Sequence, residues 1–237
     1  MKRLDFVELL THFGLTKQEA NIYMMLISEG QLTGYEAAKL TGISRSNTYT
    51  ALAGLAEKGA AWLIEGAVTR YTPVPPEEFC GNKIALLAQY RQELVQSAPV
   101  PKGDVDGYIT IKGEEHILNK IRNMLNDSEK RAYLSMSLDT IERILPELTD
   151  GVARGLKIVI ITNRPFLLDG ATVYHAEKTQ KQIRLIADSA SVLTGDLCDG
   201  KDSSCLYSQK KNLVDLFKES LKNEIKLIEL TKGKQDE

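Results

Sequence analysis

The feature that most restricts the fold is a pair of short helices joined by a glycine turn in the first quarter of the chain. Thr33–Leu40 has helical spacing of apolar residues, and Gly42 permits the tight turn that follows. Ser44 can then cap the free backbone N–H groups of a second helix, which extends to Lys58. The alanines of the first helix allow the second to cross it closely. This arrangement predicts a helix-turn-helix.

Further elements surround this pair. Leu4–Phe13 has a helical pattern, and the capping-box spacing of Thr16–Glu19 starts another helix that stops at Gly30. After the pair, Ala61–Ile64 and Thr69–Thr72 alternate in character around a glycine-containing turn, which is typical of a β-hairpin. The order of the elements predicts a winged helix-turn-helix domain over residues 1–75.

The second helix of the pair has one apolar face. Thr48, Leu52 and Leu55 recur at i, i+4 and i+7, so we expect them in the core. Short polar side chains and one guanidinium project from the other faces of its first turns, the end of such a helix that enters a major groove. The alternative is that these residues form only a solvated polar face with no binding function. The candidate DNA-binding residues are Ser44, Arg45, Ser46, Asn47, Tyr49 and Thr50, with Arg70 of the hairpin on phosphate or the minor groove.

Charge limits how such a domain binds double-stranded DNA. The formal net charge of the chain is −2, and residues 1–75 contain seven Lys/Arg and seven Asp/Glu. A binder that relies on bulk positive charge is therefore excluded. One copy should bind weakly, so two copies are expected to be needed. The same balance leaves open an adaptor that uses its winged helix for protein contact.

Prolines mark the end of this domain. Three prolines in Pro73–Pro76 interrupt regular structure, and Glu77–Ser97 then predicts one polar helix that ends before Pro99. Apolar residues recur along this linker (residues 76–103) at alternating spacings of four and three, as in a short coiled-coil seam. The alternative is packing on its own domain. The seam contains Cys80, Ile84, Leu87, Arg91 and Leu94, and dimer contacts are expected from Ile84, Leu87 and Leu94.

The remainder, residues 104–237, alternates strands with helices, which indicates an α/β layer structure. The predicted helices are Glu114–Leu125, Leu138–Arg154 with a break at Pro146, and Asn212–Leu230. The predicted strands are Val105–Ile111, Ala132–Met136, Leu156–Ile161, Ile183–Ala187, Ser191–Leu193 and Cys205–Tyr207.

Several segments resemble the TrmB-like transcriptional regulators: Leu15–Tyr23, Gly42–Tyr49, Leu55–Gly59, Arg70–Pro75 and Gln182–Leu197. The resemblance implies a prokaryotic homodimeric regulator with a winged helix, a dimerising linker helix and an α/β domain related to the phospholipase D fold. The best-known members continue into a sugar-binding domain. This chain ends at Glu237, so sugar sensing is not expected.

An enzyme is the rival interpretation, because phospholipase D-type sites use His-x-Lys followed by Asp. Here His175 and Lys178 are one residue too far apart and Asp188 is too distant, so we expect no catalysis. The acidic loop Asp196–Asp202 lacks the ligand pattern of a metal site, and no CxxC pair is present. No metal and no cofactor are expected. Without a leader-like N-terminus or a long apolar run, the chain is expected to be cytoplasmic.

The α/β domain is larger than a dimerisation clip requires, so we expect it to bind a small-molecule effector. In open α/β sheets, ligand clefts lie beyond the carboxyl ends of strands. Ser135, Ser137, Asn163 and Arg164 follow two such strands and offer polar groups to an anionic ligand. The alternative is ordinary turn and cap chemistry.

Overall fold

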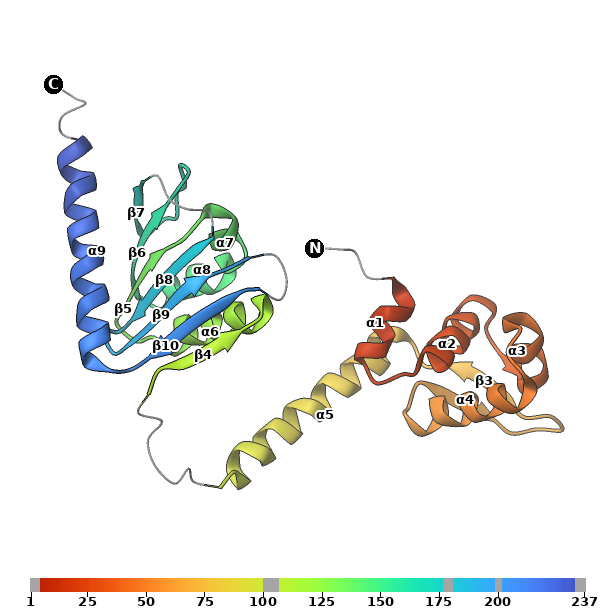
Figure 1. The fold of residues 1–237 in the computed structure, drawn as a ribbon. Helices are drawn as coiled ribbons and strands as arrows, with labels where there is room; N and C mark the ends of the chain where they lie inside the picture. The colour runs from red at the N-terminus through yellow and green to blue at the C-terminus, as the bar shows by residue number, and fades with distance from the viewer. Residues whose placement is uncertain (1–4, 100–106, 177–180, 199–201, 233–237) are drawn as a thin grey trace. The chain divides into compact units, whose positions relative to one another are not determined.

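The computed structural model describes residues 5–99, 107–176, 181–198 and 202–232, and the chain divides into two compact units (Figure 1). The first is Met1–Pro101 and the second is Lys102–Glu237. Each has an apolar core of its own.

Four short helices build the first unit: α1 (Phe6–His12), α2 (Lys17–Glu29), α3 (Gly34–Thr41) and α4 (Arg45–Glu57). Side-chain caps explain where three of them begin, because Asp5, Thr16 and Thr33 each form a capping box. The capping box predicted at Thr16 is thus confirmed. The helices enclose a core in which Tyr23 and Leu26 of α2 are fully buried.

A small antiparallel sheet completes this unit, in the order β1-β3-β2, with β1 (Leu32–Thr33), β2 (Ala61–Ile64) and β3 (Arg70–Pro73). The hairpin of β2 and β3 was predicted, whereas β1 was not. Pro73 was expected to mark a boundary outside any central strand, yet it is the last residue of the central strand β3, opposite Ala61. A strand's last residue tolerates proline because the missing N–H is not needed there. The next N–H, that of Val74, donates to Ala60 O at 2.9 Å.

The linker helix is α5 (Pro76–Ser97). Its first turn is anchored in the core of the first unit by Phe79, whose ring lies 5.9 Å from that of Tyr23 and 6.4 Å from that of Phe13, centroid to centroid. The Tyr23 hydroxyl donates to Val74 O at 2.6 Å, and burial raises the pKa of this hydroxyl to about 12. The start of α5 is therefore fixed on the winged helix.

The second unit contains a seven-stranded mixed sheet within its described residues, in the order β4-β10-β9-β8-β5-β6-β7. Strands β5, β6 and β7 are parallel neighbours, and the remaining pairs are antiparallel. The strands are β4 (Ile109–Lys112), β5 (Arg131–Ser135), β6 (Lys157–Thr162), β7 (Thr172–His175), β8 (Gln182–Ala187), β9 (Ser191–Asp196) and β10 (Ser204–Ser208).

Helices cover both faces of this sheet (Figure 1). On one face α6 (Glu114–Asp127), α7 (Leu138–Glu142) and α8 (Leu145–Ala153) pack on the larger core. On the other face α9 (Lys211–Lys232) packs on a smaller core. None of the described helices is both long and apolar enough to cross a membrane.

The predicted architecture is confirmed, with differences in detail. The order of winged helix-turn-helix, linker helix and α/β domain is as expected. The break predicted within Leu138–Arg154 is present and divides it into two helices, but it precedes Pro146, which lies in the first turn of the second helix, where its missing N–H is tolerated. Strand β7 was not predicted. It is a short edge strand with two exposed and two half-buried residues, so its apolar alternation is weak.

Candidate nucleic-acid interface

The turn between α3 and α4 is fixed by local bonds. Gly42 adopts the left-handed conformation at φ 71°, and its N–H donates to Ala38 O at 3.1 Å. Ser44 caps α4, with its Oγ accepting from Asn47 N at 3.4 Å. The buried Thr48 hydroxyl donates to Ser44 O at 3.1 Å. The first turn of α4 is therefore held firmly on the core of the domain.

The two faces of α4 are as predicted. Thr48, Leu52 and Leu55 are fully buried. The six candidate DNA-binding residues of the turn and helix, Ser44–Asn47, Tyr49 and Thr50, are all exposed. The Thr50 hydroxyl donates to Ser46 O at 3.0 Å, whereas the side chains of Ser46 and Asn47 have no partner among the described residues. Their role as DNA contacts stays a prediction.

Two aromatic rings, Tyr35 of α3 and Tyr49 of α4, lie where the start of α3 meets the start of α4. The guanidinium carbon of Arg45 lies 4.7 Å from the centroid of the Tyr35 ring, which is half-exposed. The Tyr49 ring lies against Gly34, so closely that a Cβ at this glycine would overlap it. Sequence reasoning missed Tyr35, because nothing in the pattern of α3 indicates which residue of α4 it meets.

Arg70 is the first residue of β3 and pairs with Ile64 beside the turn of the wing. Its guanidinium is 3.6 Å from Glu36 Oε2 and donates to Gln31 O at 3.4 Å. Hydrogen bonds from the backbone and side chain of Thr33 lower the pKa of the Glu36 carboxyl, and Arg70 adds to this. Arg70 therefore already has an acidic partner within the domain, whereas Arg45 has no acidic partner among the described residues. A phosphate contact by Arg70 stays a prediction.

The wing exposes more apolar side chains to solvent than its sequence pattern suggested. Trp62, Leu63, Ile64 and Val68 are exposed by 37% to 64%. Trp62 and Ile64 lie on the face of β2 away from Ala61, opposite Thr72 and Arg70 of β3. The alternating pattern correctly indicated strands, but it does not show that three consecutive residues of β2 are exposed, including Leu63 on the same face as Ala61.

The linker helix leaves its predicted seam exposed within the first unit. Ile84, Leu87 and Leu94 are exposed by 59%, 53% and 69%. Cys80 differs from the expectation, since it packs against the core of the first unit beside Phe79. The exposed part of the seam therefore begins at Ile84, and the apolar side chains of α5 after Cys80 are exposed in the first unit.

The predicted effector residues are brought together, because β5 and β6 are parallel neighbours. Each bonds to nearby protein groups. Ser137 caps α7 and shares a hydrogen bond of 3.1 Å with the Thr140 hydroxyl, and Asn163 Oδ1 accepts from Leu138 N at 3.0 Å. Arg164 forms an ion pair with Asp139, and Ser135 is buried. These bonds favour the turn-and-cap alternative, and ligand binding by the four residues stays a prediction.

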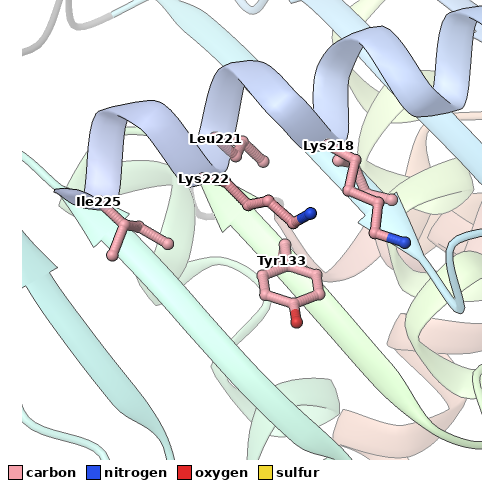
Figure 2. Close-up of a pocket in the computed structure, with 6 residues that line it drawn as sticks. Tyr133, Lys218, Leu221, Lys222 and Ile225 are labelled. Carbon is pink, nitrogen blue, oxygen red and sulfur yellow. The ribbon is translucent and has the colours of Figure 1, made fainter.

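Two hollows in the second unit offer other space for a ligand. A polar depression adjoins the start of α7, and of the four predicted residues only Ser137 lines it. An apolar hollow lies between α9 and the sheet, where Lys218 and Lys222 reach over the Tyr133 ring (Figure 2). The polar depression is lined by Glu114, Ser137, Asp139, Thr140, Arg143, Lys181, Leu197 and Cys198.

Of the residues that the rival enzyme would use, the two that the structure describes, His175 and Asp188, do not lie together. His175 ends β7 opposite Thr162, whereas Asp188 follows β8, whose last residue pairs with the beginning of β5, so the two lie at opposite ends of the sheet. Lys178 is outside the described residues. The Asp188 carboxylate accepts backbone N–H bonds from Glu129, Lys130 and Arg131 at 2.8 to 2.9 Å. Its role is to hold a loop.

The expected acidic loop differs at its start. Asp196 is the last residue of β9 and not part of a loop, because the hairpin with β10 extends that far. Asp199 is outside the described residues. Across the parts of the chain that the structure describes, no three His, Cys, Asp or Glu side chains are grouped as a metal would require. Burial raises the pKa of the Cys205 thiol to about 12, which disfavours the thiolate form that reacts.

Comparison with known families matches both units. The family described as sugar-specific transcriptional regulator TrmB matches residues 9–77. The family described as transcriptional regulator TrmB, EBD N-terminal subdomain, matches residues 107–222. The first match contains the helix-turn-helix and the wing, and the second contains the sheet.

The individual proteins and solved structures that resemble this chain have low sequence identity to it. The uncharacterized protein YrhO of Bacillus subtilis is 26% identical over 96% of this chain and 87% of its own. TrmBL2 of Thermococcus kodakarensis, a DNA-binding HTH-type transcriptional repressor, is 25% identical over 76% of each chain. A solved structure of TrmBL2, an archaeal chromatin protein, aligns at 22% identity over 92% of this chain and 96% of its own, with a TM-score of 0.44. Nuc of Salmonella typhimurium, a phospholipase D family member, aligns at 13% identity over 49% and 93%, with a TM-score of 0.40.

Proposed function

We propose, from the premise that this chain is TrmB-like in both of its units, that it is a sequence-specific DNA-binding transcriptional regulator and acts as a homodimer. The observation that carries the proposal is the start of α4. There a Gly42 turn and a Ser44 cap hold a rigid helix end whose exposed side chains are polar and include the guanidinium of Arg45. A helix presented in this way suits a major groove.

The roles of the side chains follow from their chemistry. Arg45 carries paired N–H donors that match the two acceptors of guanine, and Asn47 carries a donor and an acceptor that match adenine. Ser44 and Ser46 suit phosphate oxygens beside the helix end, as short hydroxyls commonly do. Arg70 would contact phosphate or the minor groove from the wing, exchanging its ion pair with Glu36 for the DNA.

A homodimer is proposed from charge and from the linker helix. The winged helix has no net positive charge, so one copy has little non-specific affinity to build on. The exposed apolar side chains of Ile84, Leu87 and Leu94 on α5 offer a seam for a second copy. Two winged helices on one dimer would read two half-sites.

A response to an effector is the finer part of the proposal. An anion that enters the polar depression would meet Arg143 and Lys181, and it would compete with Asp139 for Arg164. We expect phosphorylated metabolites to raise the melting temperature of the full chain in a thermal-shift screen. The Arg164→Ala variant should lose that shift, whereas Arg131→Ala, an exposed arginine at the other end of β5, should keep it. A shift that survives Arg164→Ala would move the site elsewhere.

The proposal is tested against its rival by two assays on the same protein. In a gel shift at fixed salt, we expect the chain to retard its own upstream DNA and not a shuffled sequence of equal length. A phosphodiester hydrolysis assay should give no turnover, since His175 and Asp188 are held apart and Asp188 is engaged with backbone. Hydrolysis without sequence-dependent binding would favour the phosphodiesterase. If neither activity is observed, the remaining reading is a protein adaptor.

A further inference from the structure

The first turn of α3 meets the first turns of α4 through two aromatic contacts. Tyr35 of α3 stacks under the guanidinium of Arg45, and Gly34 of α3 receives the ring of Tyr49. Thr33 and Glu36 form the capping box that fixes this turn, with Thr33 N donating to Glu36 Oε2 at 2.7 Å. The turn is therefore a rigid platform beside the helix end proposed to read DNA.

We propose that Tyr35 is a positioning residue for sequence recognition, holding the Arg45 guanidinium in the orientation in which it reads a guanine. The inference rests on the proposed function, because Arg45 must contact bases for its orientation to matter. Arginine has a long flexible side chain, and each side chain that binding immobilises costs affinity. A guanidinium already stacked on a ring in the free protein avoids part of that cost.

The kind of contact matters as much as its presence. An acidic partner would occupy the N–H groups of the guanidinium, as Glu36 does for Arg70. The Tyr35 ring, 4.7 Å from the guanidinium carbon, has no carboxylate that would occupy these N–H groups. Guanine O6 and N7 require these groups for a bidentate contact. Because Arg45 has no acidic partner among the described residues, the stack orients its charge without neutralising it.

The test compares tyrosine variants in sequence discrimination, not only in affinity. The full chain is titrated onto its own upstream site, located by footprinting, and onto copies with single guanines replaced. Tyr35→Phe keeps the ring and should keep discrimination at the guanine that Arg45 reads. Tyr35→Leu should lower it about two- to fivefold, the range of an exposed cation–π contact. Tyr108→Leu is the matched control, since it removes another half-exposed tyrosine near a cation in the second unit.

A double variant and a spectrum separate positioning from direct contact. Tyr35→Leu added to Arg45→Ala should cause no further loss, because Tyr35 acts through Arg45. In the free protein, NMR should show Arg45 side-chain protons shifted by the ring, and Tyr35→Leu should remove that shift. Additive losses, or an Arg45 spectrum that Tyr35→Leu leaves unchanged, would overturn the positioning role.

The outcomes also distinguish this inference from the proposed function. If Arg45→Ala loses discrimination and Tyr35→Leu does not, the positioning role is wrong and the DNA-reading role stands. If the wild-type chain binds its upstream DNA no better than shuffled DNA, both are wrong, whatever the spectrum shows.

Discussion

Glu19 shows how one buried carboxylate fixes the crossing of α2 and α4. Its side chain is 8% exposed and receives a hydrogen bond of 2.6 Å from Lys58. Gly54 makes room for it, since a Cβ there would overlap the carboxylate. Burial alone would raise the pKa of Glu19, but the bonds from Lys58 and Thr16 outweigh it and leave the pKa below its ordinary value. The charged form is therefore the one that stabilises the domain.

Removal of the Lys58 ammonium should destabilise the first unit, because the buried Glu19 carboxylate would lose this partner. We expect Lys58→Met, which keeps the apolar stem, to lower the free energy of unfolding of the first unit by about 1–3 kcal/mol, because Glu19 loses its main donor. Urea unfolding followed by the fluorescence of Trp62, the chain's single tryptophan, measures this. Lys39→Met is the control, because Lys39 is exposed and has no partner among the described residues. Equal stability of the two variants would contradict the account.

Asp188 has the same role in the second unit and predicts a pH dependence. Burial opposes its charge, but three backbone N–H donors, with Lys130, lower its pKa below the ordinary value. Its contribution to stability is thus complete above the pKa of an unfolded aspartate, about 3.9, and is lost as pH falls through the lowered value.

The Asp188→Asn variant should remove this dependence. We expect it to unfold more easily at pH 7, by about 1–3 kcal/mol, and to lose less stability than wild type between neutral and acidic pH. Asparagine tolerates the positive φ of 51° at this position, so backbone strain does not confuse the result. Urea unfolding followed by circular dichroism at several pH values measures both effects. If the variant loses as much stability in acid as wild type does, the pH dependence arises from other carboxylates.

At the scale of elements, local signals predicted most of the fold. Caps and glycine stops located the helices of the first unit, and the apolar run at Leu156–Ile161 located the buried strand β6. The strands that were missed, β1 and β7, are short edge strands held by neighbours distant in sequence, Tyr71 for Leu32 and Ile160 for Val173. Such strands carry too few residues to show a period.

The candidate sites, too, could be predicted only where the signal lies within one element. The buried and exposed faces of α4 follow from periodicity within one helix, so they could be predicted. Tyr35 beside Arg45 and the ion pair of Arg70 with Glu36 join different elements, and their contacts depend on how α3 packs on α4 and β3. The predicted effector residues were correctly expected to be neighbours, but the sequence does not show that their polar groups bond to one another's loops.

The seam on α5 gives the prediction at this scale. Leu87→Glu places a charge among apolar side chains that a second copy would cover, so it should weaken dimerisation and, with it, DNA affinity. Leu86→Glu is the matched control, because Leu86 lies one position away from the seam. Sedimentation velocity measures the dimer, and a gel shift measures the affinity. If Leu87→Glu remains dimeric, the interface lies in the second unit.

At the scale of the whole molecule, one chain joins a winged helix-turn-helix unit to a larger α/β unit. The first unit has equal numbers of basic and acidic residues up to residue 75, so its affinity for any DNA should be modest. Under the proposed function, selection of a site would then depend on a few base contacts repeated in a dimer, not on the attraction of phosphate. The central claim is therefore that α4 supplies sequence discrimination.

The most direct test is the ratio of dissociation constants for the chain's own upstream site and for shuffled DNA, measured at the same salt for wild type, Arg45→Ala and Asn47→Ala. Each substitution should reduce discrimination by about 1–3 kcal/mol while leaving binding to shuffled DNA nearly unchanged for Asn47→Ala. Both side chains are exposed, so the free energy of unfolding should not change. A ratio that stays at the wild-type value in both variants would contradict the claim that α4 reads the sequence.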